Sequence, residues 1–349
     1  MEDIHRILEA LQQCRERSVL ATITQVEGSA YRKEGASMLL FENGTQVGVL
    51  STGCLEADIA ARVPELLTAG APHTYTFDLD AADPLSWGEG PGCGGVIQVT
   101  AVAVGDSLRR HLLMLKDYLD DQTEVMLILR NSVDPLAAGY SFVTSSRLRF
   151  GEWPGAFPEA LLDWAVARMG WRSGMQIVPG ESEEVFVHTY FPKPRLTLFG
   201  AGPDTRPLAS YAAAAGFTVA VADWRAALCD RSFFPDAHAL LDGFPEETAG
   251  RMRWTPNDYV VIMTHHFRRD QELIRILSSH NLAYVGLLGS KRRTQQLLEG
   301  GSLPEHWHAP VGLPIGADGP EEIAFSIVAE LIQVYRTSRE QARLSYEAT

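Results

Sequence analysis

Leu198-Phe199-Gly200-Ala201-Gly202 is the stretch that decides the fold of this 349-residue chain. An apolar strand runs directly into two glycines, and a helical pattern follows them. The first glycine permits a tight turn, and the second lets the backbone approach a pyrophosphate at the N-terminus of the helix. Thr205 stands where this fingerprint usually has its third glycine. The order predicts a nucleotide-binding turn in which Gly200 and Gly202 contact the ligand.

Strands and helices alternate from this turn onward. The predicted strands are 195–199, 218–222, 259–263 and 283–288, and the predicted helices are 207–215 and 271–279. Such alternation is typical of a doubly wound parallel sheet. We therefore expect residues 191–349 to form a Rossmann-like domain, after a proline-rich linker at 191–194. The last helix, 321–335, is apolar nearly all round, so we expect it to be buried between layers or domains.

Two residues at the carboxyl edge of this sheet are candidate cofactor contacts. Asp223 ends the second strand, 23 residues after Gly200, where an acid commonly holds ribose hydroxyls. Arg225 follows closely and is the alternative contact, since a cation there would favour an extra phosphate. His265 follows another strand, where it either contacts a ligand or belongs to an exposed surface loop.

A second glycine turn, Gly289-Ser290, precedes a helix that opens with three cations, beginning with Lys291 and Arg292. Cations oppose the partial positive charge of a helix N-terminus, so they are mildly unfavourable there. A bound anion would offset this repulsion, and a solvated basic turn is the alternative. These four residues are therefore further candidate cofactor contacts.

Residues 1–190 are expected to form an N-terminal α/β domain. Its predicted elements are helices near 4–11 and 54–68 and strands at 18–26, 37–41, 46–50 and 96–104. Asn43-Gly44 predicts a tight hairpin turn, because both positions tolerate positive φ. The signals between 106 and 184 are mixed, apart from a helix near 108–119 and a strand at 125–129. We expect this segment to complete the sheet of the first domain.

Cys54 is expected at the N-terminus of the helix 54–68, where the helix dipole favours a thiolate. The dipole contributes only about 0.3–1 kcal/mol, which is less than one pKa unit. It cannot by itself ionise a thiol whose pKa is about 8.5. A nearby cation is needed, and Arg32 and Lys33 are the candidates.

Cys93 lies in Gly88-Glu89-Gly90-Pro91-Gly92-Cys93-Gly94-Gly95. So many glycines leave backbone amides free to form an anion-binding nest, with Gly92 and Gly94 as its candidate contacts. The alternative is a tight turn with an incidental cysteine. If Cys54 and Cys93 face one pocket, the pair indicates thiol or sulfur chemistry.

Composition narrows the class of protein. With 30 basic and 44 acidic residues, the net charge is −14, which disfavours binding to nucleic acid or to an anionic membrane. No apolar run reaches the roughly 20 residues of a membrane span, and the N-terminus lacks the pattern of a secretory signal. A cytoplasmic protein is therefore expected. The four cysteines form neither a disulfide framework nor a C-x-x-C pair, so we expect no structural metal site.

These blocks together resemble the XdhC/CoxI proteins, accessory factors of xanthine dehydrogenase and related molybdenum hydroxylases. The resemblance rests on 27–33, 52–56 and 92–95 in the first half, and on 198–202, 285–290, 309–316, 320–324 and 329–330 in the second. Two positions depart from the family pattern: Pro203 replaces a histidine that usually follows the G-x-G turn, and Thr52 replaces a common glycine.

The resemblance implies a maturation chaperone. It would bind the molybdenum cofactor, support its sulfuration by a cysteine desulfurase and deliver it to an apo xanthine dehydrogenase-type enzyme. Cys54 and Cys93 would be the candidate catalytic residues, because a soft thiolate suits molybdenum or sulfur transfer. A homodimer is expected only because two-fold assemblies are common.

Two other functions stay open. The first is an NAD(P)-dependent oxidoreductase, with Asp223 on the ribose and His265 as acid or base. The second is a partner-binding protein whose Rossmann domain has lost its ligand. Two glycine-flanked cysteines favour the chaperone, because a nicotinamide enzyme has no evident need for them.

Overall fold

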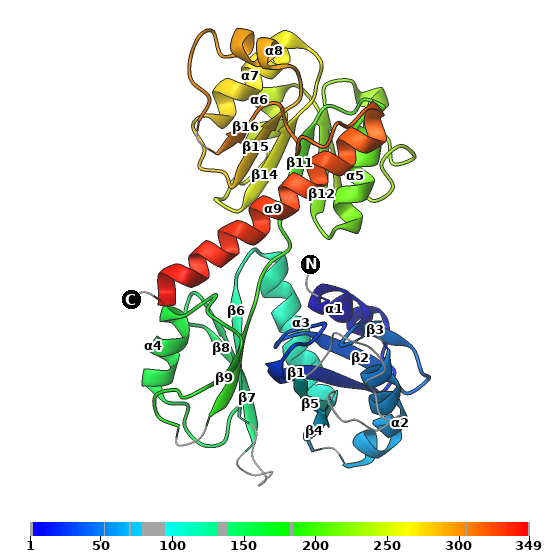
Figure 1. Ribbon diagram of the computed structural model, residues 1–349, viewed down its shortest axis with the longest axis vertical. Coiled ribbons are helices and arrows are strands. Elements are labelled where there is room, and N and C mark those ends of the chain that lie inside the picture. Colours follow the sequence, from blue (N-terminus) through cyan, green and yellow to red (C-terminus); the bar gives the residue numbers. More distant parts are fainter. Residues whose placement is uncertain are drawn as a thin grey trace. The chain divides into compact units, whose positions relative to one another are not determined.

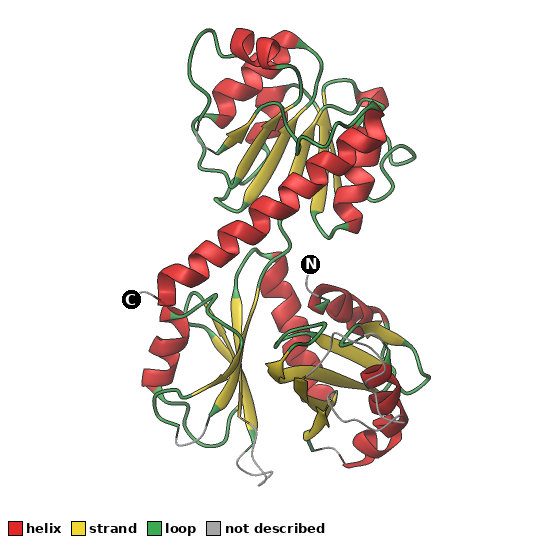
Figure 2. Cartoon of the chain, viewed as in Figure 1, coloured by secondary structure: helices red, strands yellow, loops and turns green. Residues whose placement is uncertain are grey.

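The chain divides between Pro192 and Lys193 into two compact units (Figure 1). The computed structural model describes residues 3–51, 53–69, 71–78, 95–130, 138–181, 184–304 and 306–347. Figure 2 shows that each unit combines helices with β-sheet. The mixed α/β class expected from the sequence is therefore confirmed.

The first sheet of the N-terminal unit is antiparallel. Its strands are β1 (Ser18–Gly28), β2 (Ser37–Phe41), β3 (Gln46–Gly48), β4 (His73–Asp78) and β5 (Gly95–Ala103), in the order β3-β2-β1-β5-β4. The helix α2 (Cys54–Ala69) packs its apolar stripe of Leu55, Ile59 and Val63 on one face. The helix α1 (Ile4–Gln13) packs Ile7 and Leu11 into the core on the other. Both faces of the sheet are therefore covered.

The middle segment forms a second antiparallel sheet, so our expectation that it completes the first one is wrong. Its elements are α3 (Asp106–Asp120), β6 (Val125–Arg130), β7 (Gly139–Thr144), β8 (Arg149–Glu152), α4 (Glu159–Ala167), β9 (Gly174–Gln176) and β10 (Val185–Tyr190). The strand order is β8-β7-β6-β10-β9. In β6, Leu127 faces the core shared with α1, whereas Met126 and Ile128 face a separate cluster under α4. The side chains on the two faces of β6 are thus buried in two different clusters, so the second sheet is a separate layer with packing partners on both sides.

The C-terminal unit is a doubly wound parallel sheet, as predicted. Its strands are β11 (Arg195–Phe199), β12 (Thr218–Asp223), β13 (Ala239–Asp242), β14 (Asp258–Ile262), β15 (Tyr284–Leu287) and β16 (Trp307–His308). They run in the order β13-β12-β11-β14-β15-β16, and every pairing is parallel. The order reverses between β11 and β14, which is the switch point where ligands bind in such sheets.

Helices cover both faces of this parallel sheet. They are α5 (Thr205–Ala214), α6 (Pro245–Gly250), α7 (Phe267–Leu277), α8 (Lys291–Leu297) and α9 (Gly319–Glu347), with a 3-10 turn at Ala226–Leu228. The cluster that contains α5 and α9 lies on one face, and the cluster that contains α6, α7 and α8 lies on the other. The short elements β13, β16 and α6 were not predicted from the sequence.

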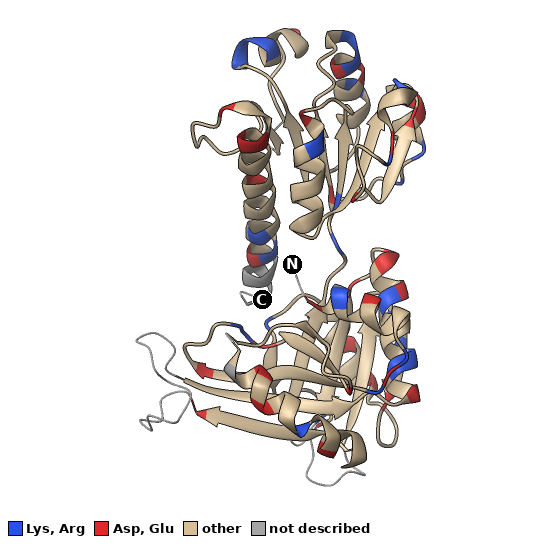
Figure 3. Cartoon of the chain, turned by 90° about the vertical axis from the view of Figure 1, so that its right-hand side faces the viewer, with Lys and Arg blue, Asp and Glu red and all other residues tan. Residues whose placement is uncertain are grey.

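The last helix is amphipathic, so the expectation that it is buried all round is wrong. Ile327 and Leu331 are fully buried in the core of the Rossmann unit, but Phe325 is 57% exposed and Ile332 is 39% exposed. Phe325 stacks on Tyr211 of α5, with 4.3 Å between the ring centroids. Figure 3 shows acidic residues at the start of α9, where negative charge suits the helix dipole.

The turn after β11 depends on a close backbone approach. Gly200 has φ of +119°, and a Cβ at this position would lie 2.4 Å from the carbonyl oxygen of Met263, just after β14. Its amide also donates to the carbonyl of Ala222, at 2.8 Å. Only glycine can satisfy both the dihedral angle and the contact. Thr205, in the place of the third glycine, is fully buried at the start of α5.

The buried carboxylate of Glu330 connects α9 to β15 and β16, at one edge of the parallel sheet. Glu330 accepts hydrogen bonds from the Tyr284 hydroxyl at 2.5 Å and from the Gly312 amide at 2.9 Å, and its other oxygen lies 3.1 Å from Nδ1 of His308. Burial opposes ionisation, but these hydrogen bonds outweigh it and hold the pKa of Glu330 below its ordinary value. The network therefore fixes the loop before α9 through a charged group.

We predict that Gly200→Ala destabilises the Rossmann unit by about 1–3 kcal/mol or more, because the new Cβ must displace the backbone of Met263. The measurement is the free energy of unfolding in urea. Gly250→Ala is the matched control, since a Cβ at Gly250 meets nothing within 4 Å. Equal stability of the two variants would contradict the prediction.

We predict that Glu330→Gln costs about 1 kcal/mol near neutral pH, because it replaces charge-assisted hydrogen bonds with neutral ones. The folded-state pKa of Glu330 is depressed, so its contribution is present above the unfolded pKa and is lost as pH falls through the folded value. The difference in melting temperature from wild type should therefore shrink between about pH 7 and pH 3. A difference that does not change with pH would rule out the charge. Glu321→Gln, on the exposed start of α9, is the control.

Candidate functional site

The glycine turn lies at the carboxyl edge of the parallel sheet, directly beside the switch point. Gly200 and Gly202 follow β11, and α5 begins at Thr205. The turn is tied to the neighbouring strand, because the amide of Ala201 donates to Oδ2 of Asp223 at 2.7 Å. The end of β12 therefore holds the turn in place through a side chain.

Asp223 is fully engaged by groups of this chain. Its side chain is 0% exposed. Oδ1 accepts from the backbone amide and Nε of Arg225, at 2.8 and 2.9 Å. Oδ2 accepts from Nη2 of Arg225 and from the amide of Ala201, each at 2.7 Å. A ribose hydroxyl would have to displace one of these donors.

The charge on Asp223 is held by the same contacts. Burial opposes ionisation, but the hydrogen bonds from Arg225 and Ala201 outweigh it and lower the pKa of Asp223. Arg225 itself stays 43% exposed and lies over the ring of Trp224, 4.6 Å from its centroid. The group that this strand end presents outward is therefore the guanidinium.

His265 reaches across the switch point to the glycine turn. Its Nε2 lies 2.6 Å from Oδ2 of Asp204, and its side chain is 62% exposed. The backbone of His265 has φ of +57°, a conformation that is uncommon outside glycine. Asp204 was not predicted as a site residue, because its partner lies 61 residues away along the chain. The pair places a carboxylate beside the helix N-terminus that would otherwise receive an anion.

A small cavity of about 130 Å³ lies behind this pair. It is lined by Asp204 and Leu208 of the α5 region, Met263 and Leu288 after two strands, and residues at the start of α9. Small-molecule sites usually enclose roughly 300–1,000 Å³. The cavity can hold a fragment of a ligand, but the body of a nucleotide would have to lie outside it.

The second glycine turn lies at the same edge of the sheet. Gly289 has φ of +141°, and Ser290 caps α8 by accepting from the amide of Arg293 at 3.3 Å. Because β14 separates β15 from β11, the two glycine turns lie about 10 Å apart. Glycine turns thus follow β11 and β15 at the same carboxyl edge of the sheet.

The cations of this second turn divide into two kinds. Arg293 is bound to the buried Asp270, with 2.6 Å between Nη2 and Oδ2. Lys291 and Arg292 are exposed and have no hydrogen-bond or ion-pair partner among the residues that the structure describes. Two cations at the ligand edge of the sheet are therefore free to meet an anion.

The candidate residues of the first unit are only partly described. Arg32 is paired with Asp3, with 2.7 Å between Nη2 and Oδ2, and Lys33 is exposed. Cys54 begins α2 as predicted, but its side chain lies outside the described residues. The segment 79–94, which includes Gly92, Cys93 and Gly94, also lies outside them, as does Thr52. The expected proximity of the two thiols therefore stays a prediction.

Glu56 organises the loop before Cys54, a role that the sequence analysis missed. Its carboxylate accepts from the amides of Leu50, Ser51 and Gly53, at 2.9, 2.6 and 3.1 Å, and from the Ser51 hydroxyl. Burial opposes ionisation, but these bonds outweigh it and lower the pKa of Glu56. The signal was visible, since a glutamate at the third helical position often reaches back to the cap. A negative charge here offsets the dipole that would favour a Cys54 thiolate.

Two features are absent from the described part of the chain. No cluster of three or more His, Cys, Asp or Glu side chains in that part could hold a metal ion. Within the same residues, no helix combines the length and apolar character that crossing a bilayer requires.

Three family models match consecutive parts of the chain. Residues 11–78 match the XdhC and CoxI family, residues 106–191 match the BH1974-like central domain, and residues 196–331 match the XdhC Rossmann domain. The central match coincides with the second antiparallel sheet, and the last one with the parallel sheet.

Individual proteins resemble the chain over nearly its whole length. A probable xanthine dehydrogenase subunit of Bacillus subtilis is 44% identical over 335 residues, which cover 95% of this chain and 98% of that protein. The molybdenum cofactor insertion chaperone PaoD of Escherichia coli is 24% identical over 91% of this chain and 83% of its own. The crystal structure of a xanthine dehydrogenase (BH1974) from Bacillus halodurans matches with a TM-score of 0.85 and 43% identity, covering 97% of this chain and 96% of that one. The chain belongs to the XdhC and CoxI family.

Proposed function

We propose that this protein is a maturation factor that binds the molybdenum cofactor, supports its sulfuration and delivers it to a xanthine dehydrogenase-type enzyme. The observation that carries the proposal is the carboxyl edge of the Rossmann sheet. Two glycine turns and the free cations Lys291 and Arg292 gather there. The relative named as a molybdenum cofactor insertion chaperone aligns over most of both chains, which supports the same function.

The described residues suit the anionic end of this cargo. The cofactor is a pterin with a phosphate, which a nucleotide can extend. The amides of Gly200 and Ala201 already donate to Ala222 and Asp223, so the backbone amides of Gly202 and of Gly289–Ser290 would bind phosphate oxygens. Lys291 and Arg292 would balance the charge of the phosphate. Asp204 would have to turn away from the helix N-terminus or keep its contact with His265 while the phosphate binds beside it. The cargo would thus compete with contacts that the chain makes to itself.

An NAD(P)-dependent oxidoreductase is the alternative that the Rossmann unit suggests. Dinucleotide enzymes use the acid at the end of the second strand to hold ribose hydroxyls. Here Arg225 and Ala201 already donate to both oxygens of Asp223. That arrangement favours an anion-binding role, because the outward-facing group is Arg225.

The thiols of the first unit would act on the sulfur or the metal of the cargo. On this proposal, Cys54 and Cys93 are the reactive groups, and the partners are a cysteine desulfurase and the apo-dehydrogenase. Glu56 keeps the loop before Cys54 in shape but adds a negative charge, so a cation is needed to ionise the thiol. Lys33, which is exposed, is the candidate for that cation. A homodimer remains an expectation from the frequency of two-fold assemblies.

We predict that the double variant Lys291→Ala, Arg292→Ala binds the molybdenum cofactor at least about tenfold more weakly, because it loses two charge-assisted contacts to phosphate. The measurement is anaerobic equilibrium binding at two salt concentrations, and the salt dependence should fall with the charges. Arg275→Ala, an exposed cation on α7, is the matched control. Unchanged affinity in the double variant would contradict phosphate binding at this edge.

We predict that Cys54→Ala or Cys93→Ala lowers the anaerobic affinity for the cofactor, the activation of an apo-dehydrogenase, or both. Cys229→Ala is the control, because burial raises the pKa of Cys229 and leaves it a poor nucleophile. If both variants keep wild-type affinity and activation, the thiols have no part in the mechanism. Substrate-dependent oxidation of NADH by the wild type would instead favour the oxidoreductase.

A further inference from the structure

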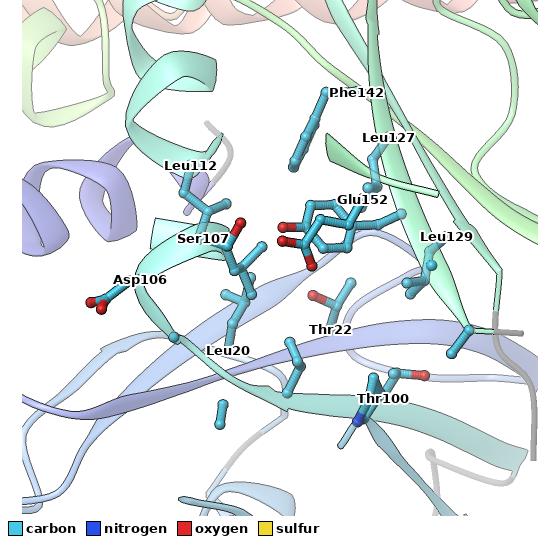
Figure 4. Close-up of a pocket in the computed structure, with 18 of the residues that line it drawn as sticks. Leu20, Thr22, Thr100, Asp106, Ser107, Leu112, Leu127, Leu129, Phe142 and Glu152 are labelled. Atoms are coloured by element: carbon cyan, nitrogen blue, oxygen red, sulfur yellow. The ribbon is translucent and has the colours of Figure 1, made fainter. Parts of the chain in front are cut away.

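A cavity of about 400 Å³ lies inside the N-terminal unit. It is bounded by β1 and β5 of the first sheet, by β6, β7, β8 and β10 of the second, and by the start of α3 (Figure 4). Its apolar wall is made chiefly of Leu20, Val102, Leu112, Leu127, Leu129 and Phe142. No motif in the sequence pointed to this place, because its walls come from two sheets that the sequence analysis had merged into one.

The size of the cavity indicates a ligand site. Protein interiors are close-packed and contain few voids larger than a water molecule. Small-molecule sites enclose roughly 300–1,000 Å³, are mostly apolar and carry a few polar groups that fix orientation. This cavity is in that range, and three aromatic residues, Tyr140, Phe142 and Tyr190, border it.

The polar groups gather at one end of the cavity. Figure 4 shows the Ser107 hydroxyl and the Glu152 carboxylate pointing into the space. The Tyr140 hydroxyl lies 2.9 Å from Nδ1 of His111. Burial lowers the pKa of His111 and raises that of Tyr140, whose hydroxyl also has a hydrogen bond with Ser107. The Tyr140 hydroxyl therefore has partners within the chain.

Glu152 is the group left for a ligand. It ends β8, is exposed, and has no hydrogen-bond or ion-pair partner within the described ranges. Asp106 and Glu152 are the acidic lining residues, and Figure 4 shows that only the Glu152 carboxylate of the two is directed into the space. None of the lining residues is Lys, Arg or His, and Arg110 outside the lining donates to the Ser107 hydroxyl at 3.2 Å. An anion is therefore disfavoured, whereas a neutral or cationic molecule with N–H donors is favoured. This is the opposite of the chemistry at the glycine turns.

We propose that this cavity binds a flat nitrogen heterocycle that presents neighbouring N–H donors to the Glu152 carboxylate and packs its ring against the leucines and Phe142. A carboxylate pairs best with two adjacent donors, because both of its oxygens accept. Pterins and guanine share such an edge. The ring could be free or part of a larger cofactor. The cavity would then be a second ligand site, which disfavours anions, and it does not depend on phosphate binding at the glycine turns.

The test is titration of the full-length protein with pterin, followed by its fluorescence, and competition by guanosine. Pterin should bind saturably in the wild type, and Glu152→Gln should bind about tenfold more weakly, because an amide offers one acceptor and adds clashing donors. Asp117→Asn, an exposed carboxylate on α3, is the matched control and should bind like the wild type. Displacement of pterin by guanosine would show that the N–H donors common to both rings are enough for binding. If guanosine does not displace pterin, the site is specific for the pteridine ring.

Two further measurements separate this site from the phosphate site. Val102→Phe should fill the cavity and abolish pterin binding; if that variant does not fold, Glu152→Gln decides alone. Inorganic phosphate should not compete with pterin, and the Lys291→Ala, Arg292→Ala variant should keep wild-type pterin affinity. No saturable binding at millimolar pterin, or equal binding by Glu152→Gln and the wild type, would overturn the proposal.

Discussion

The close approach of Gly200 to the carbonyl of Met263 sets the geometry of the Rossmann edge. It brings the turn after β11 against the end of β14, with no room for a side chain between them. From this contact follow the position of the α5 N-terminus, the hydrogen bond from Ala201 to Asp223, and the reach of His265 to Asp204. The remaining features of the edge are built around a turn that only glycine can make.

The edge is occupied largely by the chain's own groups. Asp223 is held by Arg225, Asp204 by His265, and Asp270 by Arg293. A ligand that binds here must exchange with these contacts, which lowers its affinity compared with an empty, preorganised site. On the proposed function this is an advantage, because a factor that hands on its cargo must also release it. The free cations at the start of α8 would supply attraction at this edge.

The sequence predicted the parts of the fold that local pattern controls. Alternating strands and helices, the turn at Gly200 and the hairpin at Asn43-Gly44 depend on neighbours in the chain, and each was found where the pattern indicated. In the hairpin only Gly44 has positive φ, whereas the prediction allowed it at both positions. The second antiparallel sheet was missed because its strands are short and their pairing joins residues far apart, such as Val125 with Tyr190. The exposed Phe325 was missed because periodicity does not show which apolar side chains find a partner.

Of the candidate site, only the glycine turns of the backbone could be predicted from the sequence. Glycine turns have a local signature, but the contacts of Asp223, Asp204 and Glu56 depend on which donors the fold brings near. Arg225 was predicted as an alternative phosphate contact, but its hydrogen bonds to Asp223 could not be predicted from the spacing of the two residues. The cavity beside Glu152 has walls from six strands and a helix, so no single stretch of sequence could reveal it.

The central claim is that the carboxyl edge of the parallel sheet binds the anionic part of the cargo. The most direct measurement is amide hydrogen exchange of the intact protein, with and without the molybdenum cofactor under anaerobic conditions. The account predicts slower exchange at Gly202, Asp204 and residues 289–292 when the cofactor is bound. Protection confined to other segments, with both glycine turns unchanged, would contradict it.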